Sequence, residues 1–131
     1  MIVTAFYVGL LAILFFILSL RVIALRSRVS LGDGGDPLVL RRMRGHANFA
    51  EYVPLILLMM ALLEFQHVSA WQLHAMGAVL LLARLLHGIA LSFTQKWPFG
   101  RTFGAALTLL VLVAGAIQCV VQGLRGIGLL T

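Results

Sequence analysis

Four apolar segments, each long enough to cross a lipid bilayer, constrain this chain more than any other feature. They cover approximately residues 2–25, 44–64, 70–93 and 103–124. A membrane-spanning helix needs about 20 mainly apolar residues, whereas a strand of a membrane barrel needs only about 10. Backbone amides must be paired inside the hydrocarbon layer, and segments of this length achieve that as helices. The sequence therefore predicts an all-α integral membrane four-helix bundle that forms one domain over residues 1–131.

The composition supports a membrane protein and argues against a nucleic-acid-binding one. Hydrophobic residues make up 62% of the chain and charged residues only 11%, against about 25% charged in average soluble domains. The net charge is +6, but the basic residues lie in short connectors beside apolar segments rather than in a basic domain. We therefore expect membrane lipid as a partner and no nucleic acid. A single cysteine, Cys119, excludes a disulfide framework within the chain.

The connectors between the apolar segments set the expected topology. The first contains LGDGGDP at 31–37, where we expect glycine turns, and where Pro37 should stop any helix. The second is short, so the second and third helices should be antiparallel neighbours. The first and third connectors hold nearly all the basic residues, which places them in the cytoplasm and both termini on the opposite side. The basic residues of this side are Arg26, Arg28, Arg41, Arg42, Arg44, Lys96 and Arg101.

Two of the expected helices carry polar residues on one face. Arg44, Asn48 and Glu51 are spaced four and three residues apart, so they lie within roughly 60° of one helix face, while His46 points nearly opposite. In the third helix, Arg84 is followed by a histidine three residues later, at position 87, on the same face. Polar groups in bilayer helices are costly, so they are expected to face a cavity or a partner.

The spacing alone leaves three interpretations of these residues. They can be structural, with Glu51 paired to Arg84 and Asn48 bonded across helices. They can form a proton or ion path, although the fourth helix offers only Thr108 and Gln118 to continue it. They can also bind a small zwitterionic anion, because arginines hold carboxylates in a bidentate manner and Glu51 can accept an ammonium group. The apolar helix surface around them would then hold a lipophilic second substrate. No set of metal ligands is visible.

The motifs carrying these residues resemble those of a known family. The run Arg44-x-His46-x-Asn48-x-x-Glu51-Tyr52-x-Pro54 is similar to the second-helix signature of the MAPEG family, the membrane-associated proteins of eicosanoid and glutathione metabolism. The later Arg84-x-x-His87 resembles the third-helix motif of this family, and Arg101-Thr102 resembles the start of its fourth helix. The GDGG run is similar to small bacterial members, which implies a bacterial inner membrane. The resemblance covers nearly the whole chain.

The resemblance implies a homotrimer of four-helix subunits, with glutathione bound between adjacent subunits near the cytoplasmic face. His46 would contact the tripeptide bound by the next subunit, and Arg26, with Arg21 as the alternative, would supply a further carboxylate contact across the interface. Arg84 and His87 would support the site from the third helix. The second-helix residues that would line the glutathione site are Arg44, Asn48, Glu51 and Tyr52.

The resemblance also implies a catalytic role for Arg101. A guanidinium beside the glutathione sulfur would lower the pKa of the thiol and stabilise the thiolate, which is the nucleophile. Thr102 would add a hydrogen bond from its hydroxyl. The expected activity is a glutathione-dependent transferase, or a peroxidase acting on lipid hydroperoxides. Without the resemblance, Arg101 is more simply a basic residue that anchors the helix at the membrane surface.

One position departs from the family pattern. Eicosanoid-type members carry a tyrosine four residues after the position of His87, and here that residue is Leu91. The alternative function is therefore a non-enzymatic protein of the same fold that binds lipid or other ligands, or acts as a scaffold.

Overall fold

The computed structural model describes residues 1–26, 29, 32–94 and 97–130. Arg28 and Lys96, counted above among the basic connector residues, lie outside this part. The expected order of four long helices is confirmed, and each is long and apolar enough to cross a membrane. The helices are α1 (Ile2–Arg26), α2 (Pro37–Phe65), α3 (Ala70–Ser92) and α4 (Pro98–Gly126).

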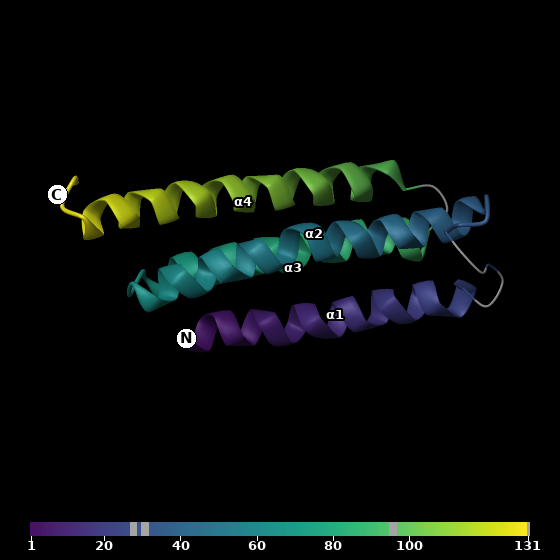
Figure 1. Cartoon of the computed structure of the whole chain (residues 1–131), viewed down its shortest axis with the longest axis horizontal. Helices are drawn as coiled ribbons and strands as arrows, with labels where there is room; N and C mark the ends of the chain where they lie inside the picture. The colour runs from purple at the N-terminus through teal and green to yellow at the C-terminus, as the bar shows by residue number, and fades with distance from the viewer. Residues whose placement is uncertain (27–28, 30–31, 95–96, 131) are drawn as a thin grey trace.

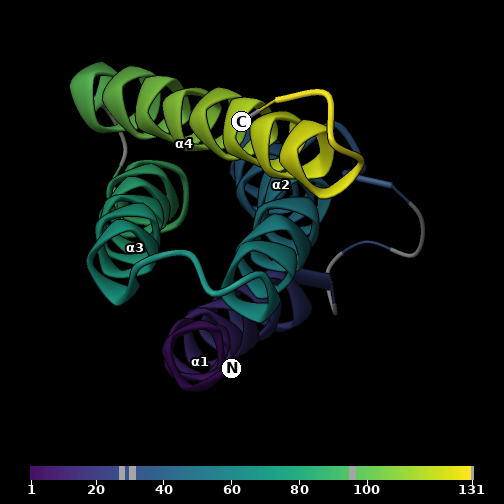
Figure 2. The same cartoon turned by 90° about the vertical axis from the view of Figure 1, so that its left-hand side faces the viewer.

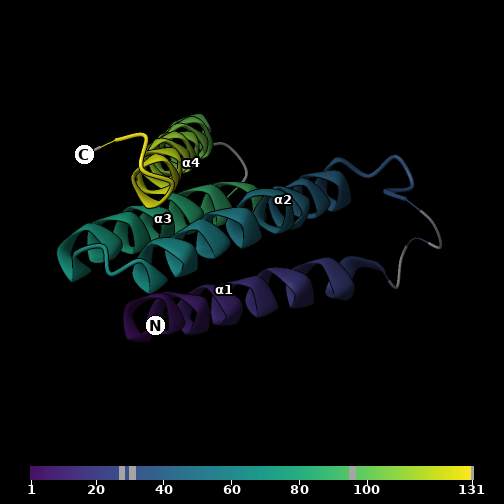
Figure 3. The same cartoon turned by 60° about the vertical axis from the view of Figure 1, so that its left-hand side comes forward.

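The four helices lie side by side along the long axis of the molecule (Figure 1). The α1–α2 and α3–α4 connections are at one end, while both termini and the short α2–α3 connection are at the other. Seen end-on in Figure 2 and obliquely in Figure 3, α1 and α4 lie on opposite sides of α2 and α3. Within the described part of the chain, every pair of helices packs together except α1 and α4. The central pair, α2 and α3, therefore supplies most of the core.

Two helices begin earlier than expected because a proline opens each of them. The α2 helix starts at Pro37 rather than near residue 44, and α4 starts at Pro98 rather than near residue 103. The expectation that Pro37 stops any helix is therefore wrong. Proline is suited to the first helical position, where its missing N–H needs no partner and its φ is already helical. Before it, the Asp36 side chain caps the helix by accepting a hydrogen bond of 2.8 Å from the Leu38 amide.

The turn between α2 and α3 depends on a histidine with a left-handed backbone. His67 has a φ of 59°, a conformation in which glycine is usual. Its amide donates to the Glu64 carbonyl at 3.1 Å, and the Val68 amide donates to the Leu63 carbonyl at 3.0 Å. These two bonds form a Schellman motif, which ends α2 and turns the chain directly into the antiparallel α3.

Glycine allows α4 to approach α3 very closely. A Cβ atom added at Gly104 would lie 2.6 Å from the Ala83 carbonyl oxygen and 2.9 Å from the His87 Cβ. Gly100, Gly104 and Thr108, spaced four residues apart, are all buried on one face of α4. Small residues at this spacing are typical of membrane helices in close backbone contact. This contact brings the first turns of α4 against the polar residues of α3.

Candidate functional site

The polar stripe of α2 is divided between the protein surface and the bundle interior. Arg44 and Glu51 are exposed, whereas Asn48 and Tyr52 are half-buried. The two exposed charges are called the α2 charged face below. Charges on a spanning helix are costly when they face lipid, so such residues normally face a cavity, a partner or each other. The sequence correctly placed Arg44, Asn48 and Glu51 on one side of the helix.

Arg84 ties three helices together in the bundle interior. Its side chain is only 1% exposed. One terminal nitrogen, Nη1, donates to the Asn48 side-chain oxygen at 2.8 Å, and Nη2 donates to the Thr108 hydroxyl. That hydroxyl in turn donates to the Gly104 carbonyl at 2.8 Å. Arg84 therefore joins α3 to α2 through a side-chain amide and to α4 through a threonine that the sequence did not identify as part of the site.

The ion pair between Glu51 and Arg84, considered for a purely structural stripe, does not form in the described part of the chain. Glu51 is exposed, and Arg84 is turned toward Asn48 and Thr108 instead. The other half of that interpretation is correct, because Asn48 does bond across helices. The spacing of Thr108 four residues after Gly104 was the available signal for its position on the α3-facing side of α4.

His87, at the α3–α4 contact, relates Arg101 to Arg84. His87 is buried one helical turn after Arg84 and interacts electrostatically with both Arg84 and Arg101. Arg101 and Thr102 are exposed in the first turn of α4. Two guanidinium groups close to one imidazole create a positive potential at this end of the bundle, which favours an anion. Arg101 is the accessible one, and Arg84 is enclosed.

His46 faces α1 rather than the α2 charged face. Its Nε2 lies 3.1 Å from the Ser19 hydroxyl, and its ring stacks on Phe15 with the ring centres 4.5 Å apart. The side of α2 predicted for His46 is therefore consistent with the structure, and these contacts are within its own chain. Arg26, also expected to reach a neighbouring subunit, is the exposed last residue of α1. The contacts of both residues with glutathione stay predictions.

Leu91 is part of the packed interior. It is 7% exposed, and a Cβ atom added at Gly45 would lie 3.2 Å from the Leu91 Cβ. The α2 and α3 helices therefore meet closely at this point. Eicosanoid-type members of the family resembled above carry a tyrosine at this position. In this chain, the leucine at the position makes an aliphatic contact between α2 and α3.

Basic residues at the connector end cap the carbonyl ends of helices. Arg41 donates to the Ala90 carbonyl at 2.9 Å and to the Thr94 carbonyl at 2.6 Å, while Arg21 donates to the Ser92 carbonyl at 2.6 Å. Cations stabilise the last turn of a helix through its unpaired carbonyls and its dipole. The sequence indicated only a charge bias between the two sides of the membrane. Pairing a particular arginine with a helix end required the three-dimensional arrangement.

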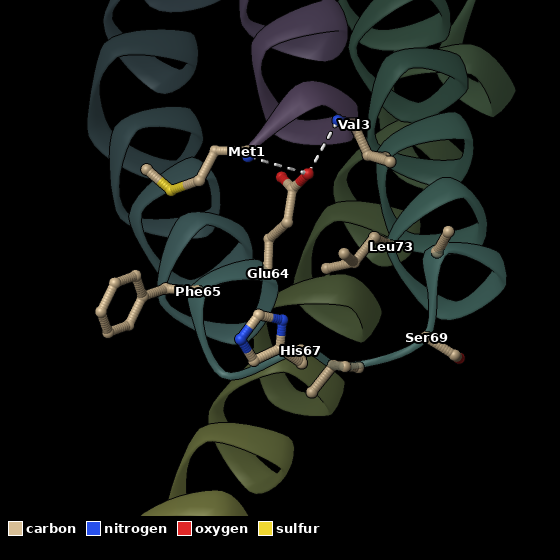
Figure 4. Close-up of a pocket in the computed structure, with 9 residues that line it drawn as sticks. Met1, Val3, Glu64, Phe65, His67, Ser69 and Leu73 are labelled. Carbon is tan, nitrogen blue, oxygen red and sulfur yellow. Dashed lines mark hydrogen bonds and ion pairs between the residues drawn. The ribbon is translucent and has the colours of Figure 1, made fainter.

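At the opposite end of the bundle, Glu64 caps the start of α1. Its carboxylate accepts a hydrogen bond from the Val3 amide at 2.9 Å and lies 3.6 Å from the Met1 amine (Figure 4). It also accepts a hydrogen bond from the Thr4 amide at 2.8 Å. A pocket of about 650 Å³ lies beside it, next to His67. The carboxylate is thus engaged in joining α1 to α2, a role that the sequence did not indicate.

Comparison with known proteins identifies the family. The model of the MAPEG family matches residues 4–121. The chain belongs to the MAPEG family. The inner membrane protein YecN of Escherichia coli (strain K12) is 38% identical over 87 residues, which cover 65% of this chain and 66% of YecN. YecN of Escherichia coli O6:H1 (strain CFT073) matches to the same extent, and no solved structure matches.

MAPEG membership and the structure agree on an all-helical membrane protein with four spans. The chain matches slightly less than two thirds of the length of the YecN proteins. Any activity or partner of this chain is therefore stated below as a proposal. The MAPEG match includes the α2 charged face, the Arg84 contacts and the start of α4. These are the residues from which a function is argued.

Proposed function

We propose that this protein is a homotrimer that binds glutathione between subunits and activates its thiolate for attack on lipophilic electrophiles or lipid hydroperoxides. By analogy with the inner membrane protein YecN, we place it in a bacterial inner membrane. The basic connectors face the cytoplasm, and both termini face the periplasm. This orientation follows the positive-inside rule.

The observation that carries the proposal is the α2 charged face. Arg44 and Glu51 are exposed in a helix of membrane-spanning length, at the end of the bundle where Arg101 is also exposed. Neither residue forms an ion pair with another described residue, and such charges at this depth favour a partner that neutralises both signs. A zwitterionic peptide does so, because Arg44 can hold a carboxylate and Glu51 an ammonium group. A second subunit would then cover the peptide and exclude lipid.

Arg101 supplies the chemistry in this proposal. Its exposed guanidinium stabilises the glutathione thiolate, and the Thr102 hydroxyl donates a hydrogen bond to the sulfur. The sulfur lone pair forms a new bond to the electrophilic carbon of an apolar substrate, and the departing or adjacent group takes the electrons. With a hydroperoxide, the thiolate attacks the terminal oxygen and releases an alcohol. A second glutathione then converts the sulfenic acid to a disulfide and water.

The enclosed residues have a positioning role in this proposal. Arg84 is too buried to reach a tripeptide, but its bond to the Asn48 oxygen fixes the amide. The Asn48 nitrogen is then oriented as a donor. From the neighbouring subunit, Arg26 and His46 would supply the remaining polar contacts to the peptide. The α1 surface beside them would hold the lipophilic substrate.

The test is a glutathione titration of the purified protein in detergent, followed by the ultraviolet absorbance of the thiolate. We expect a saturable thiolate signal in the wild type that Arg101→Ala loses. The matched control is Arg125→Ala, an exposed arginine at the opposite end of α4, which should retain the signal. Native mass spectrometry of the same samples should give the mass of three subunits. No bound glutathione by equilibrium dialysis would overturn the proposal.

A second function is favoured by the buried Leu91, because α3 supplies no tyrosine hydroxyl at this position. In that case the protein binds glutathione or a lipid without turning it over. Binding by dialysis without a thiolate signal would support this second function over the first.

A further inference from the structure

Three sulfur-bearing side chains from three different helices meet in the half of the bundle that holds the termini. Met59 lies six residues before the end of α2, Met76 six residues after the start of α3, and Cys119 seven residues before the end of α4. At 1.5 Å per residue, each is roughly 10 Å from its helix end. These three side chains are called the sulfur cluster below. The proposed glutathione site lies in the other half of the bundle.

Gly115 of α4 marks the point where the two methionines meet. A Cβ atom added there would lie 2.9 Å from the Met76 methyl group and 3.2 Å from the Met59 methyl group. The Met59 sulfur would lie 3.6 Å from the same atom. Both methionines are only 8% exposed. The missing side chain at Gly115 therefore leaves a space inside the bundle that the ends of both methionines approach.

Cys119 brings a third sulfur to this place. It follows Gly115 by four residues, so it lies on the same face of α4, one turn further along. Its Sγ lies 3.9 Å from the Met59 carbonyl oxygen, and its half-buried side chain packs against the core that contains both methionines. It is a free thiol. Met59 and Cys119 are 60 residues apart, so spacing along the sequence could not reveal the cluster.

The ligand atoms of the sulfur cluster select a soft metal ion. Thioether and thiolate sulfurs favour Cu(I), whereas magnesium and calcium take oxygen ligands. Structural zinc sites combine cysteine with further cysteine, histidine or carboxylate ligands rather than with methionine. Among the described residues, no group of three or more His, Cys, Asp or Glu side chains is placed to hold a metal ion. The sulfur cluster is thus suited to copper in its monovalent state.

The charge of such a complex suits its depth in the membrane. A cysteine thiolate carries one negative charge, Cu(I) carries one positive charge, and the two thioethers are neutral. The complex is therefore neutral overall and avoids the cost of an uncompensated charge in an apolar interior. A divalent ion with the same three ligands would leave a net positive charge.

The side chains can close around an ion with little movement of the backbone. Methionine has three rotatable bonds and a polarisable sulfur, so both thioethers can turn toward the space beside Gly115. At Gly123, one turn beyond Cys119, nothing lies within 4 Å of an added Cβ atom. The α4 helix therefore leaves the approach from this end of the bundle open.

We propose that the sulfur cluster binds one Cu(I) ion, with Met59 and Met76 as thioether ligands and Cys119 as a thiolate ligand. Each of the three sulfurs donates an electron pair to the metal. The S–H bond of Cys119 breaks, and its proton leaves to solvent. Copper stays in the monovalent state, so no oxidant or reductant takes part. The site shares no residue with the proposed glutathione site.

The experiment is an anaerobic titration of the purified protein in detergent, without glutathione, against the coloured complex of Cu(I) with bicinchoninate. We expect the wild type to withdraw one equivalent of Cu(I) per chain, seen as a loss of the visible absorbance of the complex. Loss of even an outer partner of a metal ligand costs about 10–100-fold in affinity. Cys119→Ser, Met59→Leu and Met76→Leu should therefore each weaken binding by at least about tenfold.

Met60→Leu is the matched control. Met60 is also buried, but it points about 100° away from Met59 around α2, so this variant should bind copper as the wild type does. Leucine has nearly the volume of methionine, and the unfolding midpoint of each variant without copper should show that it is folded. X-ray absorption at the copper edge should show sulfur ligands alone.

Three results would overturn the proposal. The first is equal Cu(I) binding by the wild type and Cys119→Ser. The second is a copper spectrum with nitrogen ligands, which would assign the ion to the exposed His67 and His74 or to the terminal amine. The third is no withdrawal of Cu(I) by the wild type, which would leave the sulfur cluster as packing alone. Because glutathione is absent, none of these results depends on the proposed function.

Discussion

The Arg84 guanidinium and the Asn48 side-chain oxygen lie 2.8 Å apart, in a hydrogen bond that crosses from α3 to α2 inside the bundle. This bond connects the motif of the second helix with that of the third. It also explains why Asn48 points inward while Arg44 and Glu51, on the same side of α2, are exposed.

Replacing Asn48 should therefore test the interior of the protein. Asn48→Ala removes an acceptor from a buried cation, and we expect a loss of about 1–3 kcal/mol in unfolding free energy. The loss should appear as a lower midpoint of unfolding in detergent. Asn48→Asp supplies a charged acceptor to Arg84 and should be at least as stable as the wild type. An unchanged midpoint in Asn48→Ala would mean that the bond contributes little.

Gly104 should tolerate no side chain. Gly104→Ala places a Cβ atom 2.6 Å from the Ala83 carbonyl oxygen, so α4 must move away from α3 at a cost of about 1–3 kcal/mol. Gly123→Ala is the matched control, because nothing lies within 4 Å of a Cβ atom there and alanine favours a helix. The midpoint of unfolding in detergent should be lower in Gly104→Ala, and unchanged or higher in Gly123→Ala.

His67 should be replaceable by glycine with a gain in stability. Its φ of 59° is unfavourable for a residue with a side chain, and His67→Gly should gain about 0.5–1 kcal/mol after the greater unfolded-state entropy of glycine is subtracted. Gly128, with a φ of 76° after the end of α4, gives the opposite test. Gly128→Ala should lose about 1 kcal/mol. A loss of stability in His67→Gly would indicate that the imidazole makes a favourable contact.

Glu64 should control the attachment of α1. Glu64→Ala removes the acceptor of the Val3 and Thr4 amides, and the loss of such a cap costs about 0.5–2 kcal/mol. Hydrogen exchange at these two amides should become faster, while exchange in α4 stays unchanged because α4 does not touch α1. Glu64→Gln keeps one oxygen acceptor, so its exchange rates at these two amides should lie between those of the wild type and those of Glu64→Ala. Equal exchange rates in all three proteins would contradict the capping role.

The neutral form of His46 should carry its proton on Nε2. The Ser19 hydroxyl donates to the Phe15 carbonyl at 2.9 Å, so it can only accept from the imidazole nitrogen 3.1 Å away. Nitrogen-15 NMR of histidine-labelled protein distinguishes the two tautomers. Ser19→Ala should remove the preference, and a proton on Nδ1 in the wild type would be the contradicting result.

The number and order of the helices could be predicted from the sequence because bilayer thickness sets a minimum apolar length. The starts of α2 and α4 could not, because the same proline that interrupts a helix also opens one. At α2 the cap by Asp36 marks the start, whereas α4 has no side-chain cap among the described residues. For the site, the 3.6-residue period placed Arg44, Asn48 and Glu51 on one side of α2. The partners of Arg84 could not be predicted, because Thr108 depends on how far α4 slides along α3, and Gly104 sets that register.

The contact between Glu64 and the first turn of α1 has a consequence for how the chain is assembled in the membrane. The amides of Val3 and Thr4 are synthesised early, but their acceptor lies 60 or more residues later in the sequence. The first helix must therefore enter the bilayer with the start of its backbone unpaired within the protein. These two amides gain their acceptor only when the second helix has crossed the bilayer and has brought the Glu64 carboxylate to the same side of the membrane. The order of translation thus delays this attachment of α1 until α2 has been inserted.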